Sequence, residues 1–435
     1  MSALSEASEH LLGLHEPVMA RGDGALAALR QTGRDHFAAL GLPHPQLEEW
    51  RYTNLAPLAK ERFTLPARRA VSRADLEAVA CPVFACSLCV FIDGIYDPAL
   101  SALGAGADLH VESLAALSAS ELAQSAAGLD TLVDGKLHPF AALNTALLED
   151  AAIVRAPRGT RTAEPLHVVF VSTGAGEVRS PRLFIVAEDD SQVRVIQDHV
   201  SLGGESGLTN AVTEVRVGSN AEVDCITLQR DTADGFLVSN LAAQVERSGR
   251  FGSSVLTFGG RLVRNDLSVV LAGEGAEARM NGLFVGGGKR LIDNHTLVDH
   301  AVPHCTSHEL YKGLLGGQSR GVFRGRVLVR PGAQKTWAEQ SNPNLLLSRN
   351  AEIDTKPQLE IHADDVKCSH GSAIGQLHEE ALFYLRSRAI DEHEARGLLT
   401  RGFAREVLDA LPVEALREGL EATLEASLGE AAQDE

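Results

Sequence analysis

Residues 212–228, VTEVRVGSNAEVDCITL, contain the pattern on which the fold prediction rests. Their two ends, 212–217 and 223–228, are short runs rich in β-branched residues, and such runs between turn residues are typical of β-strands. Between them, Gly218-Ser219-Asn220 supplies residue types that favour a tight turn, and the small Ala221 follows. The stretch therefore predicts a strand, a sharp turn and a second strand.

The same features recur throughout residues 156–372. Further strand-like runs lie at 166–171, 183–187, 193–196, 255–258, 267–271, 321–329 and 353–361. No amphipathic helical pattern separates them, so alternating strands and helices are not expected. The turn signature returns around Ala276, Ala333 and Ala351, and Ala221, Ala276 and Ala333 are 55 and 57 residues apart. That is about two turns of a coil of roughly 28 residues, which favours a parallel β-solenoid; a β-sandwich of similar short strands is the alternative.

Helical patterns precede and follow this β region. In residues 1–155, Ala25, Leu26, Leu29, Phe37 and Leu40 line one face of a helix that ends at Gly41. A buried strand is expected at 83–92, before a turn at 93–94, and a second helical stretch at 114–127. In residues 373–435, two apolar stripes separated by Pro412 predict two helices, which either cap the solenoid or dock a partner. We thus expect a mostly helical domain over 1–155, a β-solenoid over 156–372 and a helical domain over 373–435.

The composition of the 435 residues excludes several classes of protein. With 58 acidic and 40 basic residues the net charge is −18, so phosphate backbones and anionic membranes are unfavourable partners. Six cysteines are too few for a disulfide framework. The first residues lack a targeting pattern, and the longest apolar run, 82–92, is shorter than the ~18 residues of a membrane helix. A cytoplasmic protein is expected.

Two motifs resemble known sites without matching them. Cys81, Cys86 and Cys89 have the spacing of plant-type ferredoxin ligands, but they lie in an apolar run without a nearby fourth cysteine. We interpret them as core cysteines. Residues 286–290, GGGKR, resemble a phosphate-binding loop, yet Leu283 and Arg290 stand where that motif requires Gly and Ser or Thr. We therefore expect no nucleotide to be bound by this chain.

A third motif is a cluster of potential metal ligands within fourteen residues: His295, His300, His304, Cys305 and His308. Imidazole and thiolate are the ligands that transition metals prefer. The spacing matches neither a helix face nor a zinc finger, and Pro303 indicates a loop. These side chains either form a secondary metal site or satisfy backbone groups in a turn-rich stretch.

The last motif is Lys367-Cys368-Ser369-His370-Gly371, at the end of the β region. Residues at i and i+2 of a strand share one face, so Cys368 and His370 are expected side by side, with Lys367 lowering the pKa of the thiol. Both are suitable ligands for iron or zinc. Two ligands do not complete a tetrahedral site, which predicts a half-site completed by another subunit.

The sequence around this motif resembles the SufD branch of the SufB/SufD family, which belongs to the SUF machinery for iron–sulfur cluster assembly. The resemblance is carried by 354–361 (DTKPQLEI), 363–371 (ADDVKCSHG), 383–388 (FYLRSR), 322–325 (VFRG), 333–336 (AQKT), 344–348 (NLLLS), 293–296 (DNHT), 309–312 (ELYK) and 49–53 (EWRYT). Ala373, Ala389 and Trp337 depart from the family pattern, but none of them replaces a candidate ligand. SufB lacks a Cys-Ser-His-Gly run of this kind, which favours the SufD branch.

The resemblance implies a mainly β fold, a right-handed parallel β-helix between helical domains. It implies a non-enzymatic scaffold in a SufB–SufC–SufD complex, with an iron–sulfur cluster or iron shared with SufB, the ATPase activity on SufC, and reduced FAD at the level of the complex. His370 and Cys368 are then the interface ligands. The expected SufC docking residues lie in the C-terminal helices: Tyr384, Arg386, Arg388, Leu398 and Phe403.

Other readings remain open at this stage. Within the family, one alternative function is that of a SufB-like cluster scaffold in its own right. An alternative assembly is a homodimer, formed when the chain is alone. Outside the family, some parallel β-helices act on polysaccharides, but they need a carboxylate-lined groove and aromatic platforms, and only 5% of the residues here are aromatic. A stand-alone iron sensor binding metal through the His295–His308 segment is the third reading.

Overall fold

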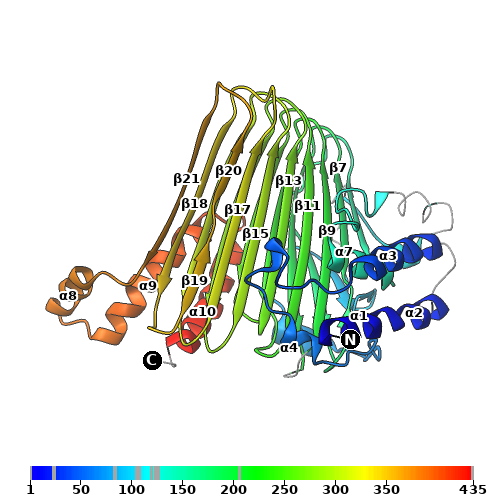
Figure 1. The fold of residues 1–435 in the computed structure, drawn as a ribbon, viewed down its shortest axis with the longest axis horizontal. Coiled ribbons are helices and arrows are strands. Elements are labelled where there is room, and N and C mark those ends of the chain that lie inside the picture. The colour runs from blue at the N-terminus through cyan, green and yellow to red at the C-terminus, as the bar shows by residue number, and fades with distance from the viewer. Residues whose placement is uncertain are drawn as a thin grey trace.

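The computed structural model describes residues 2–21, 26–81, 86–102, 109–117, 121, 128–203 and 207–432. Two large parallel sheets form the body of the molecule, and helices lie at both ends of the chain (Figure 1). The expectation of a mainly β protein with terminal helices is therefore confirmed. No helix in the described ranges is long and apolar enough to span a membrane.

Within the described residues, one sheet has ten strands. In spatial order they are β2 (Ile95–Tyr96), β1 (Ser87–Ile92), β5 (Leu166–Ser172), β8 (Gln192–Ser201), β10 (Glu222–Arg230), β12 (Arg250–Thr257), β14 (Glu277–Gly286), β16 (Thr306–Leu315), β18 (Trp337–Leu346) and β21 (Lys367–Gly375). All neighbours pair in parallel except β1 and β2, which form a hairpin. Strand β21 lies at one edge of this sheet.

The second sheet runs through β19 (Glu352–Thr355), β17 (Arg320–Val329), β15 (Leu291–His300), β13 (Leu262–Leu271), β11 (Phe236–Val245), β9 (Leu208–Val217), β7 (Arg182–Ala187), β4 (Ala152–Ala156) and β3 (His110–Ser113). The short β20 (Gln358–Ile361) also pairs with β17, and β6 (Val178–Arg179) pairs with β9. The predicted run 353–361 is thus split into β19 and β20, because Pro357 between them cannot donate a backbone hydrogen bond.

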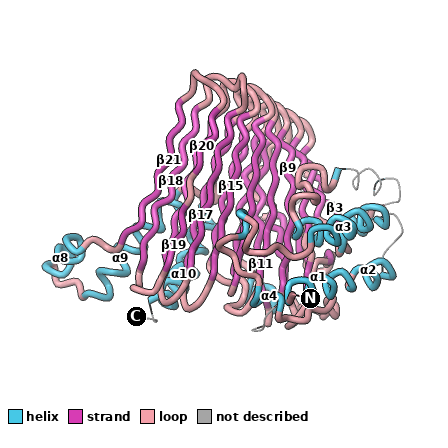
Figure 2. Tube along the Cα trace, in the orientation of Figure 1, coloured by secondary structure: helices cyan, strands magenta, loops and turns pink. Residues whose placement is uncertain are grey.

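The chain winds as a solenoid because it alternates between the two sheets. From β7 to β17, each strand pairs with the next strand but one along the sequence, and Figure 2 shows the stacked strands. Glu222 pairs with Arg250, Arg250 with Glu277, Glu277 with Thr306 and Thr306 with Trp337, which are spacings of 28, 27, 29 and 31 residues. The predicted period is confirmed, and the β-sandwich alternative is wrong.

The repeated turn signature marks the corners of the coils. Ala221, Ala276 and Ala333 are all almost completely buried, because each side chain points into the narrow corner between the two sheets. The residues before two of these alanines have positive φ, +56° at Asn220 and +74° at Gly275, which are conformations that favour Asn and Gly. A larger side chain than alanine would not fit the stacked corners without displacing neighbouring coils.

Helices cover the outer faces of both sheets. The N-terminal helices are α1 (Ala3–Gly13), α2 (His15–Arg21), α3 (Ala27–Leu40), α4 (Ala56–Ala59), α5 (Arg73–Val79) and α7 (Pro139–Ala146), with the single turns η2 (Glu48–Trp50) and η3 (Leu114–Ala116). Helix α3 ends at Gly41 with a φ of +62°, as expected. Of the helix predicted at 114–127, the structure describes η3; Ala25, 118–120 and 122–127 lie outside the described residues.

The C-terminal helices are α8 (Glu379–Ser387), α9 (Glu392–Asp409) and α10 (Glu414–Ala432). Helices α9 and α10 pack on the outer face of the ten-stranded sheet, where Leu416 and Leu420 are fully buried against residues such as Ile226 and Leu283. These two helices cover the side of the solenoid and leave its end uncovered. Helix α8 projects away from the solenoid near this end (Figure 1).

Candidate functional site at the open edge of the solenoid

Strand β21 forms an edge at which backbone hydrogen-bonding groups are unpaired within the described residues. It pairs with β18 on one side, and the Lys367 N–H donates to the Thr336 carbonyl at 2.8 Å. Since successive residues of a parallel strand direct their backbone groups to opposite sides, those of Cys368, His370 and Ser372 face the free edge. Apart from Cys368, every residue of β21 is exposed. The edge is therefore ready to pair with another strand.

Cys368 and His370 lie next to each other on the inward face of β21. Cys368 is in register with the buried Ala338, is half-buried, and packs against the small apolar cluster that contains Ala338. Its burial raises the pKa of the thiol above the ordinary value, so the expectation that Lys367 lowers it is wrong. His370 is exposed, and its ring makes no hydrogen bond or ion pair within the described part of the chain. The two sequence-predicted ligands are thus brought together at the open edge.

The segment 295–308 is not a loop, as Pro303 suggested, but two strands joined by a short turn. Its apolar and polar residues alternate, so His295 lies on the outer face of β15 and His308 on the outer face of β16, in opposite sheets. His300 is buried beside Ser307, at 2.9 Å from Nε2 to Oγ, and burial lowers its pKa to about 4. His304 is exposed in the turn, and Cys305 is buried between the sheets. These five candidates do not converge.

Elsewhere in the described residues, no group of three or more His, Cys, Asp or Glu side chains is arranged to hold a metal ion. Cys81 and Cys89 are buried in different clusters, and burial raises the pKa of each thiol to about 12. Residues of the glycine-rich turn pack against α10: a Cβ on Gly287 would lie 3.1 Å from the Cα of Ala431. The glycines of this turn therefore make room for a helix.

His295 belongs instead to an anchor for the N-terminal segment. The Arg264 guanidinium lies between Asp293, at 2.7 Å, and the carbonyl oxygen of Glu49, at 2.9 Å. His295 Nε2 lies 3.0 Å from Asp293. Although burial opposes ionisation, His295 and Arg264 hold the pKa of Asp293 at about 2. Motifs 49–53, 293–296 and 322–325 meet here, since Arg324 pairs with Glu49 at 3.0 Å.

Most of the residues expected to dock a partner lie on or near α8. Tyr384 is 55% exposed, and the Arg388 guanidinium lies over its ring at 4.9 Å. Leu398 of α9 is also exposed, and Arg386 pairs with Glu392 at 3.4 Å. Phe403 is different, because its side chain packs inward over the ammonium group of Lys312. Phe383 was not among the predicted docking residues, but at 75% exposure it is the most exposed large apolar side chain in the described residues.

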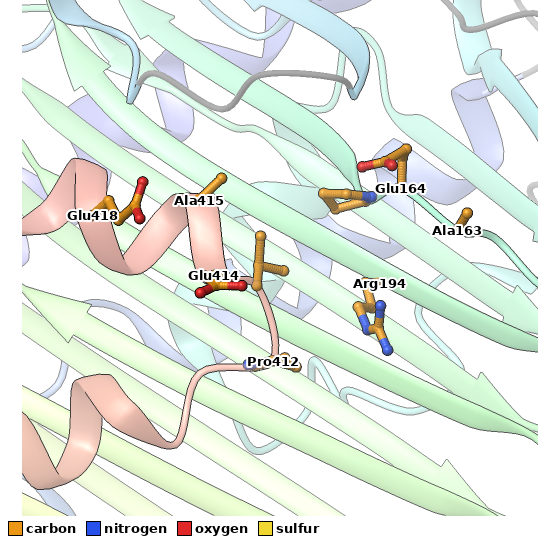
Figure 3. A pocket seen from close by; sticks show the side chains of 9 residues that line it. Ala163, Glu164, Arg194, Pro412, Glu414, Ala415 and Glu418 are labelled. Atoms are coloured by element: carbon orange, nitrogen blue, oxygen red, sulfur yellow. The ribbon is translucent and has the colours of Figure 1, made fainter.

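Two larger pockets lie away from β21. One, with a volume of about 460 Å³, is formed by the start of α10 and the loop before β5 (Figure 3). Glu414 and Glu418 line it from the helix, and Glu164 and Arg194 from the β region. The other, of about 400 Å³, lies beside Trp50 and Arg264. Neither contains Cys368 or His370.

Comparison with known proteins agrees with this architecture. Residues 170–403 match the family model described as the SufBD core domain of SUF system FeS cluster assembly, and residues 15–168 match the SufBD N-terminal region. The chain is 33% identical to an iron–sulfur cluster assembly SufBD family protein of Synechocystis, over 95% of this chain and 94% of that protein. It is 32% identical to the iron–sulfur cluster assembly protein SufD of Escherichia coli, over 87% of each chain, and 27% identical to SufD of Bacillus subtilis, over 66% of each. The chain therefore belongs to the SufBD family of iron–sulfur cluster assembly proteins.

Proposed function

We propose that this chain is a non-catalytic scaffold subunit of a SufB–SufC–SufD complex in the cytoplasm, and that iron–sulfur clusters assemble at its interface with SufB. The observation that carries the proposal is the juxtaposition of Cys368 and His370 on an edge strand whose outer backbone groups have no partner among the residues that the structure describes. Membership of the SufBD family and similarity to two proteins named SufD support it.

The chemistry of the two side chains suits a shared site. A neutral imidazole nitrogen is a good iron ligand, and in this proposal His370 is the principal ligand that the chain donates. Cys368 is the second ligand in this proposal. Alternatively, Cys368 controls access to the interface, because its half-buried thiol resists ionisation. Iron and the nascent cluster are cargo of the complex, and SufB supplies the remaining ligands across the edge of β21.

The contacts of α9 suggest how a partner on the C-terminal helices is linked to this edge. SufC, which hydrolyses ATP, docks in this proposal on the surface formed by Phe383, Tyr384 and Leu398. Lys312 of β16 ties α9 to the sheet, because its buried ammonium group donates to the Phe403 carbonyl at 3.1 Å and pairs with Glu406. Strand β16 pairs with β18, which pairs with β21. A movement of the helices would thus be transmitted through two neighbouring strands.

The experiment that tests the proposal is His370→Ala in cells that depend on this complex. We expect the assembled complex and its ATPase activity to persist, because His370 is exposed and bonded to nothing within the described residues, while maturation of iron–sulfur enzymes collapses. Ser372→Ala is the matched control, since Ser372 lies on the same exposed face of β21. Normal enzyme maturation in His370→Ala cells contradicts the proposed site. Stable cluster binding by the isolated chain favours a scaffold that acts alone.

A further inference from the structure

The interior of the solenoid becomes polar directly behind His370. Glu309 of β16, Gln340 of β18 and His370 of β21 occupy consecutive positions of one ladder, Glu309 paired with Gln340 and Gln340 with His370. In-register residues of parallel strands direct their side chains to the same face, and neighbouring strands are about 4.8 Å apart. Glu309 and Gln340 are 4% and 3% exposed, whereas His370 is exposed. The three side chains thus form a row from the buried interior to the open edge.

The two buried members of the row are bonded to each other. Gln340 Nε2 donates to Glu309 Oε2. Gly325 of β17, in the opposite sheet, leaves room for the amide, because a Cβ atom at this position would lie only 2.1 Å from Gln340 Nε2. Because Nε2 donates to Glu309, the amide presents its Oε1 elsewhere.

Gln340 Oε1 is itself buried and has no hydrogen-bond partner within the described residues. Buried polar atoms are nearly always paired, so a donor is expected beside this oxygen. The next side chain along the row is the imidazole of His370, which is also without a partner in the described part of the chain. Its ring N–H is a donor, and His370 is in register with Gln340.

We propose that Gln340, supported by Glu309, is a positioning residue for His370. One ring N–H of His370 donates to Gln340 Oε1, which leaves the lone pair of the other ring nitrogen facing the free edge, where iron is bound. The hydrogen bond from Gln340 to Glu309 polarises the amide and so strengthens its acceptor oxygen. Ligating histidines commonly donate their second ring nitrogen to a carbonyl or carboxylate, which fixes the tautomer. This inference deepens the proposed function and rests on it for the role of His370.

The tautomer of His370 is the direct readout. In the full chain with ¹⁵N-labelled histidine, assigned by loss of the signal in His370→Asn, we expect one neutral tautomer to dominate. Gln340→Met keeps the size of the side chain but removes the acceptor, so the tautomer ratio should shift several-fold towards that of an exposed histidine. Glu309→Gln should shift it in the same direction by less. Glu339→Gln, on the outward face of β18, is the matched control and should leave the ratio unchanged.

A second readout concerns metal affinity. In the complex with SufB, Gln340→Met should weaken binding of Co²⁺, used as a spectroscopic probe, by about 10–100-fold. An unchanged tautomer ratio in both folded variants, Gln340→Met and Glu309→Gln, overturns the positioning role. If His370→Ala abolishes cluster assembly but the tautomer ratio of His370 is unchanged in Gln340→Met, the proposed function is supported and the positioning role is excluded. If the tautomer ratio changes in Gln340→Met but His370→Ala cells assemble clusters normally, the positioning role is supported and the proposed function is excluded.

Discussion

The guanidinium of Arg264 lies 3.8 Å from the centre of the Trp50 ring, and this contact joins the N-terminal segment to the outer face of β13. The ring of Trp50 also stacks on Phe140 of α7 at 5.6 Å. Arg264 is 2% exposed and holds two carboxylates, those of Asp266 and Asp293. One buried cation therefore connects helices from the first third of the chain to the middle of the solenoid.

Arg264→Met should destabilise the protein strongly. Removing the cation leaves the buried Asp293 with only His295 and Thr53 as partners among the described residues. Breaking a buried pair costs about 3–5 kcal/mol. The free energy of unfolding in urea is the measurement, together with proteolysis of the N-terminal segment. Arg250→Met is the control, because its pair with Glu222 is exposed and should contribute at most about 1 kcal/mol. Equal effects of the two substitutions would show that Arg264 is not the anchor.

Glu309→Gln should change how stability depends on pH. Burial raises the pKa of Glu309 from 4.5 to about 7, so the folded state binds a proton that the unfolded state has released between these values. The stability that Glu309 contributes is complete below pH 4.5 and is lost as the pH rises to about 7. As the pH rises from 4.5 to about 7, the free energy of unfolding of the variant should therefore increase relative to that of wild type by up to about 3 kcal/mol. Stability curves that run parallel from pH 4.5 to 8 would contradict this prediction, and Glu339→Gln is the exposed control.

Ser372→Pro should prevent association with SufB without unfolding the chain. The substitution removes a backbone donor that faces the free edge, and proline is tolerated in edge strands. Ala373→Pro is the matched comparison, because the backbone of Ala373 faces β18 and the loss of a ladder bond should destabilise β21 itself. Co-purification of SufB and circular dichroism of the isolated chain provide the two measurements. If Ser372→Pro chains retain SufB, the partner does not pair along this edge.

Phe383→Ser combined with Tyr384→Ser should reduce SufC binding at least about tenfold, since exposed aromatic side chains commonly dominate interface energies. The fold should be unaffected, because both rings are largely in solvent. Substitution is preferable to removing residues after Ile390, which would expose the apolar surface under Leu416 and Leu420. Leu137→Ser is the control, as Leu137 is 72% exposed and belongs to the N-terminal region. Undiminished SufC binding by the double variant would place the docking surface elsewhere.

The coil of the solenoid was predictable because its determinants are local. Runs such as 223–228 combine β-branched residues with a turn, and Ala221, Ala276 and Ala333 recur at corners where only a small side chain fits. The shared face of Cys368 and His370 was predictable for the same reason, since the two-residue period of a strand depends only on the backbone. These features do not depend on the residues of the neighbouring coils.

The histidines between 295 and 308 were misplaced because strand formation there depends on neighbours in the sheet. His295 is satisfied by Asp293 and by Glu49, a residue about 250 positions earlier, and these partners are not visible in the local sequence, where Pro303 suggested a loop. Glu309 and Gln340 were not predicted to lie near the site, although both alternate with outward-facing residues in their strands. Their burial, and the row they form with His370, arise when coils of about 30 residues stack in register. Local chemistry along the chain thus determined the coil and the Cys-x-His pair, whereas long-range stacking decided which polar side chains became buried and which edge stayed open.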